Sequence, residues 1–243
     1  MKILGSISAV AFLAWTAISQ AAPVTFSDGV FSDADWTAQK ILDGAFSSFQ
    51  VATGGNPGEF RETDHLNLNT GQSIFVVNLR TSAVYNPSIT GAISSIDISF
   101  DAKFLGGSTG TSQFSVRLAF EQGGIIFVPL TVGTALGPGN GQPGLAFQSF
   151  SLPGFTPTDF VTIGPSGSLD FSSSGAPITF GYVTSDTLQA DNGFVKGAVD
   201  NWSVTVHPSN GTSVPEFSSS FLLFGLSLLA LLPFARRQAK LVS

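Results

Sequence analysis

The sequence predicts an all-β protein, an antiparallel β-sandwich placed between an N-terminal leader and a C-terminal membrane segment. Three observations predict this fold class. Apolar and polar residues alternate with a period of two in several short stretches. Turns rich in Gly and Pro separate these stretches, with 27 Gly and 13 Pro in 243 residues. No stretch of the body sustains the 3.6-residue period of an amphipathic helix. About a dozen short strands joined by such turns favour a sandwich of the jelly-roll type.

Residues 1–21 have the pattern of a secretory signal peptide. Lys2 gives a positive start, residues 3–18 are apolar, and small residues lead to a cleavage position between Ala21 and Ala22. This pattern predicts that the secretion translocon and signal peptidase act on the chain. A retained N-terminal membrane helix is the alternative.

The predicted strands follow one another along a body that spans residues 22–208. Each is apolar or alternating and is bounded by turn-forming residues. They cover residues 24–26, 45–51, 59–66, 73–80, 93–105, 114–121, 125–132, 147–152, 159–163, 168–171, 178–183 and 196–207. Residues 133–145 contain five Gly and two Pro and are predicted to be a loop. Residues 209–213 are predicted to be a flexible linker.

The clearest strand covers residues 93–105. Its apolar residues alternate with polar ones, and those predicted to be buried are Ile96, Ile98, Phe100, Ala102 and Phe104. Residues 114–121 repeat the pattern, so the two stretches predict an antiparallel hairpin. On its polar face, Asp97 or Asp101 would then lie across from Arg117.

The charge of the body excludes some partners. Fifteen of the 16 acidic residues and six of the 10 basic residues lie within residues 22–213, so the body has a net charge near −9. A domain this acidic is not expected to bind nucleic acid. The chain has no Cys, which excludes thiolate metal sites and a Cys nucleophile.

An acidic loop follows the first predicted strand. Asp28, Asp33 and Asp35 occur there at short spacing beside Gly29, and such carboxylates can present oxygen ligands to calcium. The spacing is not that of an EF-hand. The alternative is turn chemistry, because Asp accepts hydrogen bonds from its own backbone in loops.

The densest polar cluster of the body lies at residues 59–66. Arg61, Glu62 and Asp64 would bind a sugar or a metal near the sheet edge, and aromatic rings that suit sugar faces occur at Trp36, Tyr85 and Tyr182. The alternatives are a solvated strand face with ion pairs for the charged residues, and core packing for the aromatic ones. Two His residues, His65 and His207, are too few for a multi-His metal centre.

The last predicted strand carries a family resemblance. It begins Val199-Asp200-Asn201 and continues with Trp202, and it resembles the closing strand of jelly-roll carbohydrate-binding and concanavalin-like modules. In those families an Asp at this point helps to hold a structural calcium ion with residues of the first strands. The resemblance implies that Asp200 would share a calcium ion with Asp28 or a neighbour.

The C-terminal thirty residues form a three-part tail. Val214, Pro215 and Glu216 precede residues 217–234, which carry no charge, and the basic residues Arg236 and Arg237 follow. A helix of eighteen residues at about 1.5 Å per residue spans roughly 27 Å, close to the thickness of a bilayer core of about 30 Å. Basic residues after an apolar span stay in the cytoplasm, so the body is predicted to lie outside. A buried core helix is the alternative.

This tail resembles the PEP-CTERM sorting architecture of Gram-negative bacteria. Pro215 and Glu216 match the first two motif positions, and Phe217 stands where the family usually has Pro. The resemblance covers about residues 214–237 and implies handling by an exosortase, often alongside exopolysaccharide production. It implies sorting to the cell envelope, with membrane anchoring or with release to the surface or matrix after processing.

The sequence favours a non-catalytic function. No G-x-S-x-G motif occurs, and no acid pair can be assigned as a glycosidase couple, although Glu59, Glu62 and Asp101 remain candidates. We expect an exported protein of the cell envelope or matrix that binds glycan or exopolysaccharide. A purely structural surface or biofilm component and a secreted polysaccharide hydrolase are the alternatives.

Overall fold

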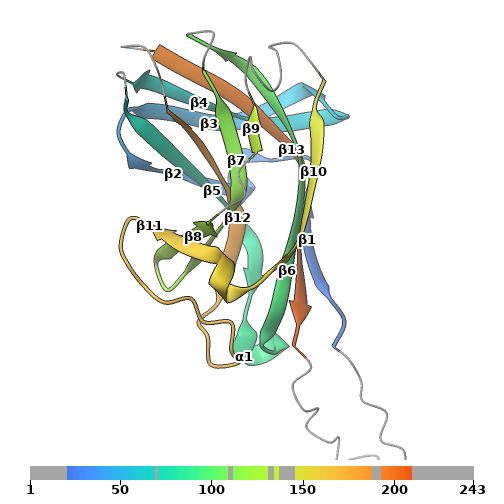
Figure 1. Cartoon of the computed structure of the whole chain (residues 1–243). Coiled ribbons are helices and arrows are strands. Elements are labelled where there is room, and N and C mark those ends of the chain that lie inside the picture. The colour runs from blue at the N-terminus through green and yellow to red at the C-terminus, as the bar shows by residue number, and fades with distance from the viewer. Residues whose placement is uncertain are drawn as a thin grey trace, which may run out of the picture. The chain divides into compact units, whose positions relative to one another are not determined.

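Two antiparallel sheets, A and B, face each other across an aromatic core in the computed structural model (Figure 1). The structure describes residues 21–68, 71–108, 112–130, 134–136, 146–187 and 193–209. Over these residues the predicted all-β antiparallel sandwich is confirmed. Most of the predicted leader and the whole C-terminal tail, with its apolar segment at 217–234, lie outside the described residues.

Sheet A is built around its most C-terminal strand, β13. Its strands, in spatial order, are β10 (Gln148–Phe155), β6 (Ile93–Gly107), β13 (Gly193–Pro208), β4 (Gly58–Leu68) and β3 (Ala45–Gly55), with β1 (Val24–Asp28) also on β13. One edge of β13 pairs with β6, whereas the other edge pairs first with β4 and then with β1. The change of partner falls at a bulge, where Asn201 adopts a φ of 48°.

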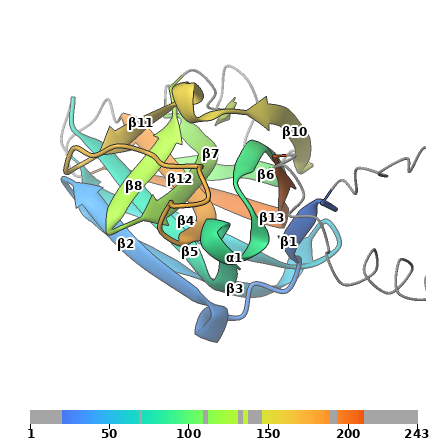
Figure 2. The same ribbon diagram turned by 90° about the horizontal axis from the view of Figure 1, so that it is seen from below.

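Sheet B forms the second layer. Its strands, in spatial order, are β11 (Phe160–Ile163), β8 (Ile125–Pro129), β7 (Phe114–Gln122), β12 (Ile178–Thr187), β5 (Ser73–Tyr85) and β2 (Trp36–Leu42), with β9 (Thr134–Leu136) also on β7. The short helix α1 (Pro87–Thr90) connects β5 to β6 and lies at one end of the sandwich (Figure 2). Two 3₁₀ turns cover Asp33–Asp35 and Pro157–Asp159.

The core is made mainly of aromatic side chains from both sheets. Phe120 lies at its centre, with ring contacts to Phe127, Phe160, Phe171 and Phe180. Such rings contribute packing energy beyond the area that they bury. A chain without disulfides therefore obtains its stability from a conventional apolar core.

The alternation predicted for β6 and β13 is confirmed. Phe100 and Ala102 are buried in the core, whereas Ser99 and Lys103 on either side of them are partly exposed, and Asp101 between them lies on the outer face at 7% exposure. In β13, Trp202 and Val204 point inward, and Ser203 points to the outer face. Period-two patterns thus identified the buried face of each strand correctly.

The predicted hairpin between residues 93–105 and 114–121 is wrong. β6 belongs to sheet A and pairs with β10 and β13, whereas β7 belongs to sheet B and pairs with β12, β8 and β9. Arg117 therefore lies across from Val183, not from Asp97 or Asp101. Alternation shows which face of a strand is buried, and it is silent on which neighbour the strand takes.

Several element predictions are corrected. Residues 168–171 form no strand, although Phe171 is buried, and residues 134–136 form β9 inside the predicted loop. The strand β2 was not predicted. Ser209, expected to begin the linker, donates its backbone N–H to the carbonyl of Ala92. In the part of the chain that the structure describes, no helix has the length and apolar character needed to cross a membrane.

Candidate functional site

The three aromatic residues predicted to contact a ligand are buried. Trp36, Tyr85 and Tyr182 are 4%, 1% and 0% exposed. The Trp36 ring packs against Phe31, Tyr182 and Trp202. The Tyr85 hydroxyl donates to the carbonyl of Gly91, 2.9 Å away. Their prediction as exposed contacts is therefore wrong, and their core-packing alternative holds.

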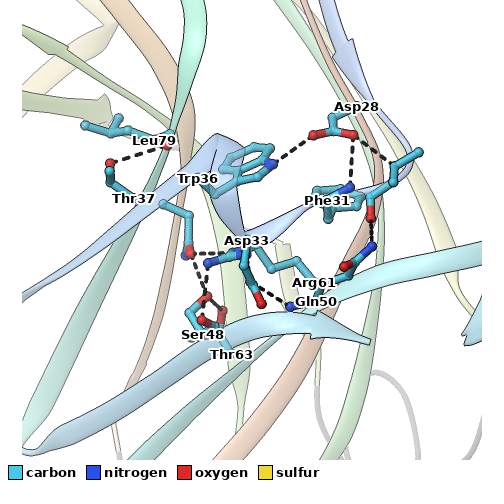
Figure 3. Close-up of polar contacts among 12 residues, drawn as sticks. Asp28, Phe31, Asp33, Trp36, Thr37, Ser48, Gln50, Arg61, Thr63 and Leu79 are labelled. Carbon is cyan, nitrogen blue, oxygen red and sulfur yellow. Dashed lines mark hydrogen bonds and ion pairs between the residues drawn. The ribbon is translucent and has the colours of Figure 1, made fainter. Parts of the chain in front are cut away.

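Arg61 is also an interior residue, which corrects its prediction as a ligand contact (Figure 3). Its side chain on β4 is 3% exposed and crosses the space between the sheets. Its Nε donates to Asn78 Oδ1 at 3.1 Å, Nη1 to Asp33 Oδ1 at 2.8 Å and Nη2 to the Ser48 carbonyl at 3.2 Å. The guanidinium also lies 5.9 Å from the centre of the Trp36 ring. Arg61 joins the sheets from inside.

Of the carboxylates predicted to bind calcium, Asp28, Asp33 and Asp200 each make separate structural contacts. Asp28 accepts the backbone N–H groups of Val30 and Phe31 on one oxygen and the Trp36 indole N–H on the other, at 2.8 to 3.0 Å. Burial opposes ionisation of Asp28, but these hydrogen bonds and the Arg80 guanidinium lower its pKa on balance. Among the described residues no three His, Cys, Asp or Glu side chains lie close enough to hold a metal ion.

Glu62 and Asp64 lie on the outer face of sheet A, beside Lys196. Lys196 Nζ is 2.9 Å from Asp64 Oδ2 and 3.5 Å from Glu62 Oε1. Burial and the neighbouring Asp64 raise the pKa of Glu62. The Lys196 ammonium pairs with both carboxylates, so the ion-pair part of the structural alternative fits, but Asp64 is only 7% exposed and does not lie on a solvated face.

A polar chain that the sequence did not predict lies inside the sandwich. His65 Nδ1 is 2.9 Å from Asp186 Oδ2, and its Nε2 is 2.9 Å from Thr184 Oγ1. The order hydroxyl, imidazole, carboxylate is that of a hydrolase triad. However, His65 and Thr184 are 0% exposed and Asp186 is 6% exposed, so a substrate cannot reach the hydroxyl in this structure. The chain joins β4 of sheet A to β12 of sheet B.

β10, β6 and β13 run side by side in sheet A (Figure 1). A hollow opens on their outer face. It encloses about 270 Å³ and is lined by Ser99, Phe100, Asp101, Ser149, Phe150, Ser151 and Asn201. Pairing of Ser149 with Asp101 and of Ser151 with Ser99 sets the four polar residues on one face of two adjacent strands. Phe100 and Phe150 direct their rings to the core and form only the floor of the hollow.

The tip of the hairpin between β3 and β4 folds over the same face. Asn56 Nδ2 donates to Asp101 Oδ2 at 3.0 Å, and Asn201 Nδ2 donates to the same oxygen at 2.7 Å and to the Asn56 carbonyl at 2.5 Å. The backbone N–H of Asn56 donates to Asp200 Oδ2. The Phe60 ring, next to the tip, contacts the Phe147 ring with 5.8 Å between centres. The tip is thereby fixed beside the hollow.

The glycine at position 55 is required by this close approach. A Cβ atom there would lie 2.7 Å from Asp200 Oδ2 and 2.5 Å from the carbonyl oxygen of Glu59. Only glycine lets the hairpin tip come this near to β13.

Asp101, which lines the hollow, and its cross-strand neighbour Asp200, which is 0% exposed, differ in electrostatics. Burial opposes ionisation of Asp101, but hydrogen bonds from Asn201, Ser149 and Asn56 hold its pKa below the usual range. Burial raises the pKa of Asp200, and the nearby Asp101 and Glu59 add to the effect, against the hydrogen bonds from Asn56 and Asn201. Asp101 therefore stays ionised in mild acid, and it is 7% exposed beside the hollow.

This arrangement presents hydroxyl, amide and carboxylate groups to one small space. Serine hydroxyls both donate and accept, amides do the same with fixed geometry, and Asp101 accepts. Such a set can bind a ligand rich in hydroxyl groups. Sequence reasoning named Asp101 as an outward carboxylate and as a candidate acid of a hydrolase, and it missed Asn56 as a site residue. The Gly-Gly-Asn-Pro-Gly sequence predicted the turn at the hairpin tip, but it did not predict which residues the tip contacts.

Comparisons with known proteins give structural neighbours only. No protein-family model matches the chain, and no curated protein matches it. A family 11 carbohydrate-binding module from Clostridium thermocellum, solved with a β-1,3-1,4-mixed-linked tetrasaccharide, shares 16% identity at a TM-score of 0.44, covering 74% of this chain and 94% of that chain. The CBM22-1 xylan-binding domain from Paenibacillus barcinonensis Xyn10C shares 11% identity at a TM-score of 0.39, covering 81% of this chain and 99% of that chain. Since both TM-scores are below 0.5, neither likeness carries an argument about this chain.

Proposed function

We propose that the domain of residues 22–208 is a non-catalytic glycan-binding domain and that the hollow beside Asp101 is its binding site. The observation that carries the proposal is the convergence of Asp101, Asn201, Ser99, Ser149 and Ser151 on one hollow. The structural neighbours are described as carbohydrate-binding modules, but the proposal rests on the hollow.

The contacts of the hollow suit a sugar unit. Asn201, Ser149 and Ser151 are exposed and available to a ligand, whereas Asp101 is buried and held in place by two amides. Fixed acceptors and adjustable hydroxyl groups together bind ligand hydroxyls without a large ordering cost. The hairpin tip provides one wall, because Asn56 is bonded to both Asp101 and Asn201.

Removing the polar groups of the hollow is expected to weaken glycan binding. We expect Asp101→Ala and Ser149→Ala to lower affinity for a bound polysaccharide, with the larger loss, about tenfold or more, for Asp101, because a buried charge-assisted hydrogen bond is worth about 1.5–3 kcal/mol. Asn201→Gly removes the amide and keeps a residue suited to positive φ. Affinity gel electrophoresis against a polysaccharide panel measures the effect.

The matched control for these variants is Asp35→Asn, an exposed acid in the 3₁₀ turn before β2. It changes the charge by the same amount as Asp101→Ala and should bind as the unaltered domain does. Absence of retention on every polysaccharide by the unaltered domain would refute glycan binding and favour a purely structural surface component.

We further propose that the chain is exported and sorted by an exosortase, with the body outside the cytoplasm. The support is the leader pattern of residues 1–21, the tail of residues 214–243 and the exposure of Ala21 and Ala22 without regular secondary structure. The full chain should fractionate with membranes and expose its body to added protease on the outside. A variant that ends at residue 213 should be released. Recovery of the full chain in the cytoplasm would rule out export.

A further inference from the structure

We infer that the hollow prefers an amino sugar with a free ammonium group over neutral and acidic sugars. This inference rests on the proposed glycan binding and names the class of ligand for that site. Its basis is uncompensated negative charge beside a set of hydroxyl and amide groups.

The carboxylates at the hollow have no cationic partner among the described residues. Asp101 and Asp200 pair across β6 and β13, and both receive hydrogen bonds from neutral groups only. Glu59 is a further carboxylate near Asp200 and contributes to the raised pKa of Asp200. In contrast, Asp28, Asp33 and Asp64 each have an arginine or lysine within 3.3 Å. Among the buried carboxylates of the described residues, Asp28 and Asp64 have such a cation and Asp186 has His65 at 2.9 Å, so Asp101 and Asp200 are the two without a cationic partner.

The nearest basic residue on the same face is directed elsewhere. Lys103 lies two residues beyond Asp101 on β6, and its Nζ is 5.7 Å from the centre of the Phe147 ring. It makes no ion pair with Asp101 or Asp200 in the described structure. A cation brought by the ligand would therefore meet Asp101 without displacing a protein side chain.

Asp101 is prepared to receive such a cation. Three neutral donors hold its pKa low, so the carboxylate is charged over the range in which a sugar amine is protonated. It is 7% exposed, and a charge pair near a protein surface is stronger than one in bulk water. Because Asn56 and Asn201 fix the carboxylate, little side-chain ordering opposes binding.

Other cations fit the lining less well. Calcium takes 6–8 oxygen ligands, and no three acidic side chains converge among the described residues. A lysine side chain would use the carboxylate but would leave Ser99, Ser149 and Ser151 without partners. A hexosamine presents an ammonium and several hydroxyl groups within one ring, and it matches both kinds of group. A uronate would bring a second carboxylate and repel Asp101.

The test compares oligosaccharides of equal length on the domain of the full exported chain by isothermal titration calorimetry. We expect a glucosamine oligomer to bind at least tenfold more tightly than its N-acetylated counterpart and an oligogalacturonate to bind more weakly than both. The preference should shrink as salt rises. It should also shrink as the pH rises through the pKa of the sugar amine, because the ammonium is lost while Asp101 stays ionised.

The variant Asp101→Asn should remove the preference, so that the glucosamine oligomer binds no more tightly than the acetylated oligomer, whereas Asp35→Asn should leave the preference unchanged. Equal affinity for the free and acetylated oligomers would overturn this inference and leave glycan binding standing. Binding of oligolysine as tight as that of the glucosamine oligomer would also overturn it. Failure to bind any oligosaccharide would overturn the proposed function itself.

Discussion

Replacing Arg61 with Ala is expected to lower the free energy of unfolding by about 2–5 kcal/mol. The guanidinium is 3% exposed and bonds to Asn78, Asp33 and the carbonyl of Ser48. Its removal takes one donor from each of these acceptors, although Ser48 Oγ still donates to Asn78 Oδ1 and the Gln50 N–H to Asp33 Oδ1, and it opens a cavity beside the Trp36 ring. Urea unfolding followed by tryptophan fluorescence measures the loss, since Trp36 is part of the same cluster (Figure 3).

Two further variants make the Arg61 result specific. Arg61→Lys keeps the charge but cannot reach three acceptors with one ammonium group, so it should recover only part of the loss. Lys40→Ala removes an exposed cation from β2 and should change stability by less than about 0.5 kcal/mol. An Arg61→Ala protein as stable as the Lys40→Ala protein would show that the three hydrogen bonds of the Arg61 guanidinium do not stabilise the packing of the two sheets.

Replacing His65 with Leu is expected to cost about 3–5 kcal/mol of unfolding free energy. Asp186 is 6% exposed and its Oδ1 already lacks a hydrogen-bond partner. Without the imidazole, Asp186 Oδ2 loses its contact with His65 Nδ1, which lies 2.9 Å away. The Asp186 carboxylate then remains buried without a group that compensates its charge. The measurement is the free energy of unfolding in urea at neutral pH.

The double variant His65→Leu with Asp186→Leu separates the His65–Asp186 interaction from the effect that each substitution has by itself. Replacing both members with apolar residues removes the unpaired charge, so the double variant should be more stable than His65→Leu alone. Comparison of the two single variants with the double variant should give a coupling energy between His65 and Asp186 of about 0.5–3 kcal/mol. Strictly additive effects of the two substitutions would show that His65 and Asp186 do not support each other.

The fold class was predictable because it depends on local patterns. Alternation in residues 93–105 and 196–207, and turns such as Gly54 to Gly58, are properties of short stretches of chain. The partner of each strand is not a local property. β6 and β7 follow one another in sequence and share a pattern, yet they belong to opposite sheets.

The candidate site was less predictable, because its residues come from distant parts of the chain. Asn56, Asp101 and Asn201 meet across separations of 45 to 145 positions. Arg61 and Trp36 were predicted as contact groups because their chemistry suits sugars, but the same chemistry suits a buried cation over an aromatic ring. Residue type alone does not decide between these roles.

The place of β13 in sheet A has a consequence for the order of events during biogenesis. β13 holds β6 on one edge and β4 and β1 on the other, and it is the most C-terminal strand among the described residues. Val24 pairs with Val206, so the sheet closes only after nearly the whole body has been made. Contacts of such long sequence separation form slowly. Until residue 208 emerges the chain has no complete sheet A, and a chain in that state can still be threaded through a narrow pore.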